Sequence, residues 1–153
     1  MDYQNKLNEH LQIIVGKRLD DLSLVCELMS FAFGDYVFRA LGLTRIIREN
    51  DILVTTIDYL NWDQETDTNN DEWYFVKQYK DKIVGGTVVS ATVNSLYDVV
   101  IILDNGIRIE TYIKNGYHHY DDECEQWCLF KVDDHSHPFI TVWNKTVDIA
   151  TDW

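Results

Sequence analysis

The sequence predicts an α+β domain in which a strongly curved antiparallel sheet, made of hairpins and meanders, packs on one central helix. Segments rich in β-branched and aromatic residues recur along most of the chain, with turn residues between them. Asn105-Gly106 separates two of these segments and is the strongest short-range signal of a β-hairpin. One stretch, residues 71–84, combines a helical stripe of apolar residues with the glycine stop Gly85-Gly86.

The first half of the chain is expected to form hairpins. Residues 22–33 fit both helical and alternating periodicity, but the turn residues Gly34-Asp35 and the β-rich segment after them favour a hairpin. A second turn is expected at residues 49–51. The expected elements of this half are residues 6–15, as a helix or a strand, then strands at 22–33, 36–47 and 52–60.

The second half is expected to begin with the helix and to continue as a meander. Residues 61–70 read as a polar loop, and Asn69 with Glu72 resembles a capping box at the helix start. The strands expected after the helix are residues 87–93, 97–103, 107–113, 125–132, 139–143 and 146–150. No internal repeat and no linker is expected, so residues 1–153 are interpreted as a single domain.

The charge balance is strongly acidic, with 26 Asp and Glu residues against 13 Lys and Arg and a formal net charge of −13. Such a surface repels phosphate backbones and anionic lipids, so binding to nucleic acid or to a membrane is not expected. A basic protein partner is favoured instead. The N-terminus lacks the pattern of a secretory signal, and three cysteines form no disulfide framework, so the sequence indicates a reduced, cytoplasmic protein.

Residues 115–137 contain four of the five histidines and two of the three cysteines. On a strand, Cys124 and Cys128 would lie about 13 Å apart, which one zinc ion cannot bridge with bonds of about 2.3 Å. The cysteines are therefore interpreted as small buried hydrophobic residues, and no metal is expected. One alternative stays open, namely a weak metal site that combines Cys124 with His118, His119, His135 and His137.

The acidic loop at residues 63–74 has carboxylates at several of the positions that bind calcium in an EF-hand loop. Thr68 stands where glycine is needed, and Tyr74 stands where a bidentate glutamate should be, so calcium is not expected. The chain has no glycine-rich phosphate loop, no zinc-protease motif and no serine nucleophile elbow. We therefore assign no catalytic residue, no metal ligand and no cofactor from the sequence.

Several short motifs together resemble a known group of proteins. They are Val-Gly-Lys-Arg-Leu at 15–19, Phe-Ala-Phe-Gly-Asp at 31–35, Leu-Thr-Arg-Ile at 43–46, the hairpin segment at 95–113 and Glu-Gln-Trp at 125–127. This arrangement is similar to a loose group of small uncharacterised bacterial proteins, some of which resemble immunity proteins encoded beside polymorphic toxins. The resemblance covers most of the chain and implies no catalytic residue.

The sequence therefore predicts a non-enzymatic, acidic protein-binding module, and the resemblance implies an immunity protein that neutralises a basic toxin domain. The expected contact residues are Trp62, Asp63, Glu65, Asp67 and Asp71, with Asp121, Asp122 and Glu123 as a second patch. Two alternatives stay open. One is a small-ligand-binding domain or enzyme with a pocket between helix and sheet. The other is a subunit that homodimerises through an exposed sheet edge.

Overall fold

The structure is a computed structural model that describes residues 2–25, 28–60, 63–66, 78–116, 124–133, 139–144 and 146–150. One sheet has six strands in the order β1 (Asp21–Val25), β2 (Leu28–Phe33), β3 (Tyr36–Ala40), β9 (Trp127–Lys131), β10 (Phe139–Val142) and β11 (Val147–Ala150). The other has five, in the order β5 (Asp51–Thr55), β4 (Leu43–Arg48), β8 (Ile107–Tyr112), β7 (Val99–Leu103) and β6 (Val88–Val93). The described helices are α1 (Gln4–Leu11), the 3₁₀ turn η1 (Gln12–Ile14), α2 (Thr56–Leu60) and α4 (Lys80–Ile83).

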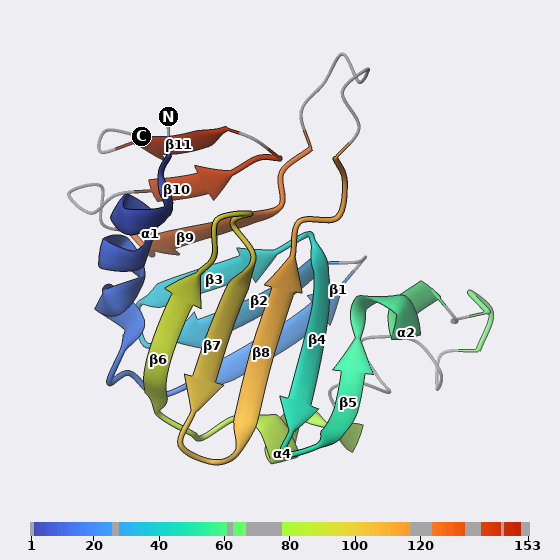
Figure 1. Ribbon diagram of the computed structural model, residues 1–153. Helices are drawn as coiled ribbons and strands as arrows, with labels where there is room; N and C mark the ends of the chain where they lie inside the picture. The colour runs from blue at the N-terminus through green and yellow to red at the C-terminus, as the bar shows by residue number, and fades with distance from the viewer. Residues whose placement is uncertain are drawn as a thin grey trace.

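The α+β class and the antiparallel pairing are confirmed, but the expected single, strongly curved sheet with one central helix is wrong. Figure 1 shows two stacked sheets, with the strands of the six-stranded sheet running across behind those of the five-stranded sheet. The chain changes sheet at Leu41-Gly42, the two residues between β3 and β4. The second edge of β3 pairs with β9, so β4 does not fold back onto β3 and instead begins the second sheet.

Two expected hairpins of the first half are confirmed. Gly34-Asp35 forms the turn between β2 and β3, where Phe33 pairs with Tyr36 and Gly34 has a φ of 63°. Glu49-Asn50 joins β4 to β5. The expected strand at residues 52–60 is correct only as far as Thr55, because the chain then forms α2.

The helices differ from the expectation in place and length. The ambiguous segment at residues 6–15 is mostly helical, because α1 and η1 bury Leu7, Leu11 and Ile14 at helical spacing. Of the helix expected at residues 71–84, the described part is Gln78 together with α4. Helix α4 ends at Ile83, and Gly85, which has a φ of 102°, follows two residues later. Residues 67–77, with the proposed capping pair, lie outside the described residues.

Helix α1 protects the outer edge of β6. The Asn8 side chain accepts a hydrogen bond from the Val93 N–H at 2.8 Å and donates one to the Val93 carbonyl at 3.2 Å. Gln4 also donates to the Val93 carbonyl, and Gln12 donates to the carbonyl of Ala91. Because these three amides are spaced four residues apart, they line one face of the helix and satisfy backbone groups that an edge strand would otherwise expose.

The two halves of the chain have the same topology, a structural repeat that the sequence does not show. Strands β1 to β5 of the first half correspond to β6 to β10 of the second. One sheet has the order β1-β2-β3-β9-β10, and the other has the equivalent order β6-β7-β8-β4-β5. Each half therefore contributes a three-stranded meander to one sheet and exchanges its last two strands with the other half.

The register of the two exchanged pairings is equivalent as well. In the first sheet Tyr36, Phe38 and Ala40 face Lys131, Leu129 and Trp127; in the second sheet Ile107, Ile109 and Thr111 face Arg48, Ile46 and Thr44. The two halves also pair directly, through Arg18 and Thr87. The sequence Ile-Val-Gly ends two positions before each of them, at residues 14–16 before Arg18 and at residues 83–85 before Thr87.

The core lies between the sheets and is aromatic in the six-stranded sheet. The ring centroids of Phe38 and Trp127 are 5.5 Å apart, and those of Phe31 and Phe38 are 6.2 Å apart. Trp127 is fully buried, and its indole N–H donates to the Tyr97 carbonyl at 2.9 Å. This hydrogen bond satisfies the one polar group of the tryptophan, so the ring can be buried without an unpaired donor.

Replacing Gly106 with valine is expected to lower the free energy of unfolding by about 1–3 kcal/mol. Gly106 has a φ of 84°, as expected, but three residues, Asp104 to Gly106, connect β7 to β8, so the expected two-residue turn is wrong. The cost is conformational, since a Cβ here meets only the Glu49 side chain, at 3.7 Å. Denaturant unfolding would measure it, and Gly106→Asn should cost less because asparagine tolerates this conformation. An equal loss for both variants would contradict a conformational cause.

Candidate functional site

The outer face of the five-stranded sheet carries a charged cluster that we call the Arg–Glu–Tyr cluster, made of Arg45, Arg108, Glu110 and Tyr112. Side chains alternate along a strand. On β8, Ile107, Ile109 and Thr111 are buried, and the residues between them point to the other face. Arg45 of β4 joins them because it pairs directly with Glu110.

Glu110 is the centre of this cluster. Its Oε1 accepts hydrogen bonds from Nε and Nη2 of Arg45, at 3.1 and 2.6 Å, and from the Tyr112 hydroxyl at 2.6 Å. Its Oε2 accepts one from Nε of Arg108 at 2.7 Å. The guanidinium carbon of Arg45 also lies 5.7 Å from the centroid of the Tyr112 ring. One carboxylate thus fixes three neighbouring side chains.

The electrostatics of Glu110 favour its charged form. Glu110 is only 7% exposed, and burial alone would raise the pKa of its carboxyl group. The hydrogen bonds from Tyr112, Arg45 and Arg108 outweigh burial and lower the pKa to about 2. The same bond to Glu110 raises the pKa of Tyr112. Near neutral pH the Glu110 carboxylate is therefore charged, Tyr112 keeps its proton, and the hydrogen bonds hold both side chains in place.

The arginines of the cluster still present donors to solvent. The side chains of Arg45 and Arg108 are 36% and 41% exposed. Aliphatic neighbours lie beside them, because Leu43 pairs with Tyr112 across the strands and Ile102 pairs with Arg108. Both aliphatic side chains are more than a third exposed. The face thus combines ordered guanidinium groups, a phenol and uncovered apolar surface.

The equivalent position in the six-stranded sheet holds different chemistry. There Arg39 takes the place of Glu110, and it pairs with Cys128 in the place of Arg45. The Arg39 guanidinium lies over the Phe130 ring, 5.1 Å from its centroid. Cys128 is almost fully buried, and burial, aided by the charge of Glu125, raises the pKa of its thiol to about 12. This thiol is unreactive at neutral pH, as expected for a small buried hydrophobic residue.

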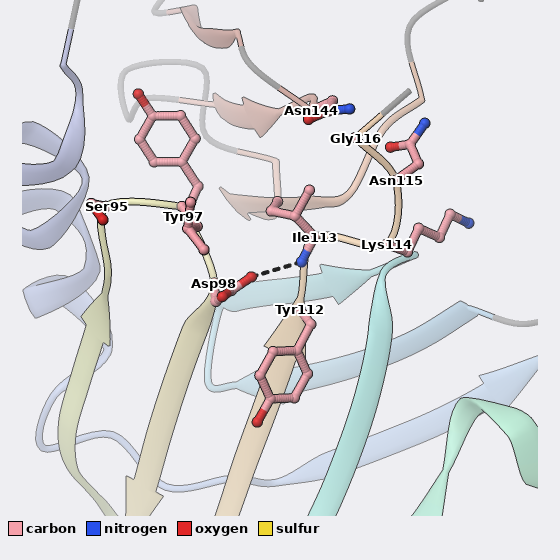
Figure 2. A pocket seen from close by; sticks show the side chains of 10 residues that line it. Ser95, Tyr97, Asp98, Tyr112, Ile113, Lys114, Asn115, Gly116 and Asn144 are labelled. Carbon is pink, nitrogen blue, oxygen red and sulfur yellow. Dashed lines mark hydrogen bonds between the residues drawn. The ribbon is translucent and has the colours of Figure 1, made fainter. Parts of the chain in front are cut away.

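A shallow pocket of about 570 Å³ lies at the end of the five-stranded sheet next to the cluster. Figure 2 shows it between the β6–β7 connection, the end of β8 and Asn144. In this view the Tyr97 ring points up, toward the N-terminus, where its hydroxyl accepts a hydrogen bond from the Tyr3 N–H at 3.4 Å, and the Tyr112 ring points down. The residues that line the pocket are Ser95, Leu96, Tyr97, Asp98, Tyr112, Ile113, Lys114, Asn115, Gly116 and Asn144.

Hydrogen bonds fix the walls of this pocket. Asp98 accepts a bond from the Ile113 N–H at 2.8 Å, which ties the β6–β7 connection to the end of β8. Gln126 is fully buried, and its side chain accepts a bond from the Lys114 N–H and donates to Asn115 and to the Cys124 carbonyl. The pocket therefore lies at the long β8–β9 connection of the second half. The equivalent β3–β4 connection of the first half has only two residues.

The structure describes only two of the contact residues expected from the sequence. Asp63 and Glu65 are both exposed, and Asp63 accepts hydrogen bonds from the N–H groups of Glu65 and Thr66, so its carboxylate organises its own turn. The remaining candidates lie outside the described residues; they are Trp62, Asp67, Asp71, Asp121, Asp122 and Glu123.

The open metal alternative cannot be placed in the described part of the chain. Cys124 is partly buried just before β9. The histidines at 118, 119, 135 and 137 lie outside the described residues. Among the residues that are described, no group of three or more His, Cys, Asp or Glu residues is arranged to hold a metal ion.

Sequence reasoning did not identify the Arg–Glu–Tyr cluster or the pocket. The signal for the cluster was the alternation of Arg108, Glu110 and Tyr112, which places three polar side chains on one face of a strand. An exposed strand face usually shows this pattern, so the pattern alone does not indicate a site. The partner, Arg45, lies 65 residues away in the sequence and could be assigned only from the pairing of β4 with β8.

No protein-family model matches the chain, and neither does any curated protein or solved structure. In the described ranges no helix has both the length and the apolar character needed to cross a bilayer.

Proposed function

We propose that this chain is a non-enzymatic protein-binding module whose partner binds the outer face of the five-stranded sheet. The Arg–Glu–Tyr cluster carries the proposal. Arginine and tyrosine are enriched among the residues that contribute most of the binding energy at interfaces. Because Glu110 already holds Arg45, Arg108 and Tyr112 in place, their side chains lose little conformational entropy on association.

The surroundings of the cluster fit an interface with a basic protein. Leu43 and Ile102 supply apolar surface beside the arginines. The described residues 49–60 and 63–66, which begin at the β4–β5 turn, include five carboxylates and no Lys, Arg or His. Acidic groups at the rim of an interface accelerate encounter with a basic surface, whereas the partly apolar centre supplies binding energy.

In its finer form, the proposal is an immunity protein that neutralises a basic toxin domain in the cytoplasm. The net charge of −13 and the resemblance to immunity proteins of polymorphic toxin systems support it. If it is correct, the captured partner should arrest growth when it is expressed alone, and co-expression of this chain should restore growth. A partner that is harmless on its own would contradict the finer form and leave the binding proposal standing.

Site-specific photo-crosslinking in a lysate of the source cells tests the binding face. A photoreactive residue at Ile102 should crosslink to a basic protein, and the same residue at Ser23, which is exposed on the outer face of β1 in the other sheet, should not. Replacing Arg108 with alanine should weaken binding of that protein about 30-fold, the value of a 2 kcal/mol hot spot. Equal crosslinking from both positions, or unchanged affinity in the Arg108 variant, would contradict the proposal.

The pocket supports a second candidate function, namely binding of a small ligand. Its volume of about 570 Å³ falls in the range of ligand sites, and Lys114 offers a cation at its edge. The pocket does not lie between a helix and a sheet, as the sequence suggested, but at the loop end of the five-stranded sheet. A fragment screen by NMR should give saturable shifts at Lys114 and Asn144 if this function is correct, and none if it is not.

A further inference from the structure

We propose that the outer edge of β5 binds an extended, basic segment of the partner protein as a sixth strand of the five-stranded sheet. This inference rests on the proposed function, because it names the chemistry of the partner and a second element that contacts it. It also goes beyond the binding face, since the contact is made by the backbone of an edge strand.

In the other half of the internal repeat, the strand equivalent to β5 already pairs with one more strand. Strand β5 is equivalent to β10, and β10 pairs with the additional antiparallel strand β11 through four residue pairs, from Phe139–Ala150 to Val142–Val147. In the described part of the chain no strand pairs with the corresponding edge of β5. The geometry of this fold therefore accommodates a strand at that position, and one half of the molecule already contains it.

The two edges of the five-stranded sheet differ in how far side chains cover their backbone groups. The edge of β6 is covered by three amide side chains of α1 and η1, which form hydrogen bonds with the backbone of Val93 and Ala91. Among the residues that the structure describes, only one side chain caps a backbone group of β5 in this way. It is Asp58 of α2, which accepts a hydrogen bond from the Thr55 N–H at 2.7 Å. Figure 1 shows β5 at the margin of the sheet, beside α2. An uncovered edge strand is a template for pairing with another chain.

The exposure and charge of β5 indicate what that chain would be. Ile52 is 54% exposed, so it offers an apolar contact to an incoming strand. Glu49 and Asp51 stand exposed at the start of β5, and Asp58 and Glu65 stand exposed beyond its end. Because the described residues 49–60 and 63–66 carry five carboxylates and no Lys, Arg or His, a second copy of this acidic segment would be repelled. A strand that carries Lys or Arg at alternate positions complements the edge in both backbone and charge.

Hydrogen exchange with synthetic peptides tests the proposal on the full chain. The probe is a peptide of alternating Lys and Val, compared with a Glu–Val peptide and with a Lys–Val peptide that is N-methylated at alternate residues and cannot pair. At about ten times its Kd, the Lys–Val peptide should slow amide exchange across residues 51–55 about tenfold. The other two peptides should leave exchange there unchanged.

A matched pair of variants isolates the contribution of charge. The triple variant Glu49→Gln, Asp51→Asn and Glu65→Gln should weaken binding of the Lys–Val peptide and make the remaining binding less sensitive to salt. The control variant Glu9→Gln, Asp35→Asn and Asp81→Asn removes the same number of exposed carboxylates elsewhere and should bind the peptide as the wild type does.

Several outcomes would overturn the edge proposal. They are protection at another edge, equal protection by the N-methylated peptide, no protection at all, and concentration-dependent protection of β5 without peptide, which would show that a second copy occupies the edge. These results can be separated from the test of the proposed function. A partner that crosslinks at Ile102 while β5 stays unprotected by peptide would show binding at the face without strand addition.

Discussion

Replacing Gly42 with alanine should destabilise the protein by more than about 3 kcal/mol, because the new Cβ would have no room. A Cβ at Gly42 would lie 2.3 Å from the backbone oxygen of Tyr112, well inside van der Waals contact. The backbone cannot move away easily. The N–H groups of Leu41 and Gly42 both donate to the Gln126 carbonyl at 2.8 Å, and the Thr44 hydroxyl donates to the Gly42 carbonyl.

The position of Gly42 explains why the effect should be large. It lies in the two-residue connection where the chain leaves β3 and enters β4, and it contacts the end of β8 there. A shift at this point would disturb both the β4–β8 pairing and the buried Gln126, which holds the pocket wall. For a chain of this size, a loss of about 3 kcal/mol lowers the melting temperature by roughly 6–12 °C.

The matched control for this variant is Gly116→Ala. A Cβ at Gly116 meets nothing within 4 Å. Thermal unfolding of the two variants under the same conditions compares a glycine that has no space with one that has ample space. A melting temperature for Gly42→Ala within about a degree of the Gly116→Ala value would mean that the crossover is loosely packed, contrary to the structure.

The sequence predicts strands well here because their signals are local. The turn residues Gly34-Asp35 and Asn105-Gly106 lie between segments of β-branched and aromatic residues, and both hairpins form where those signals occur. The division into two sheets is different, because it depends on which distant strands pair. The pairings of β3 with β9 and of β4 with β8 join residues far apart in the sequence, and no local pattern specifies them.

The sequence does not reveal the structural repeat or the Arg–Glu–Tyr cluster, and the reason is the same for both. Equivalent positions of the two halves share little beyond Ile-Val-Gly, since Phe38 corresponds to Ile109 and Arg39 to Glu110. Only the strand order and the register show that these positions are equivalent. Two half-buried arginines around Glu110 likewise become a site only when β4 and β8 are adjacent. Helix α1 was ambiguous because a short apolar segment fits both periodicities until its burial is known.

Replacing Glu110 with glutamine should lower the free energy of unfolding by about 2–3 kcal/mol at pH 7. Glutamine has a similar shape, but it carries no charge, and its amide donors would face those of Arg45 and Arg108. Removing one partner of such a buried network leaves the others uncompensated. The cost stays below that of a fully buried network, because both arginines are more than a third exposed and water screens them.

The pH dependence gives this prediction its specific signature. The pKa of Glu110 is lowered from 4.5 to about 2 in the folded chain, so its ionised form stabilises the fold fully above pH 4.5. That stabilisation is lost as the pH falls from about 4.5 to about 2, where the carboxyl group becomes protonated in the folded state too. The difference in stability between wild type and Glu110→Gln should therefore be constant near neutrality and should vanish toward pH 2.

Urea unfolding measured at a series of pH values between 2 and 7 would provide this comparison. Tyr112→Phe should show a smaller loss, on the order of 1 kcal/mol, because it removes one of the four hydrogen bonds to Glu110 and leaves the charge in place. Glu9→Gln, an exposed carboxylate on α1, should change neither the stability nor its pH dependence appreciably. A stability difference for Glu110→Gln that persists undiminished at pH 2 would show that the residue stabilises the sheet by its shape and not by its charge. The Arg–Glu–Tyr cluster would then lose the electrostatic lock on which the proposed binding face depends.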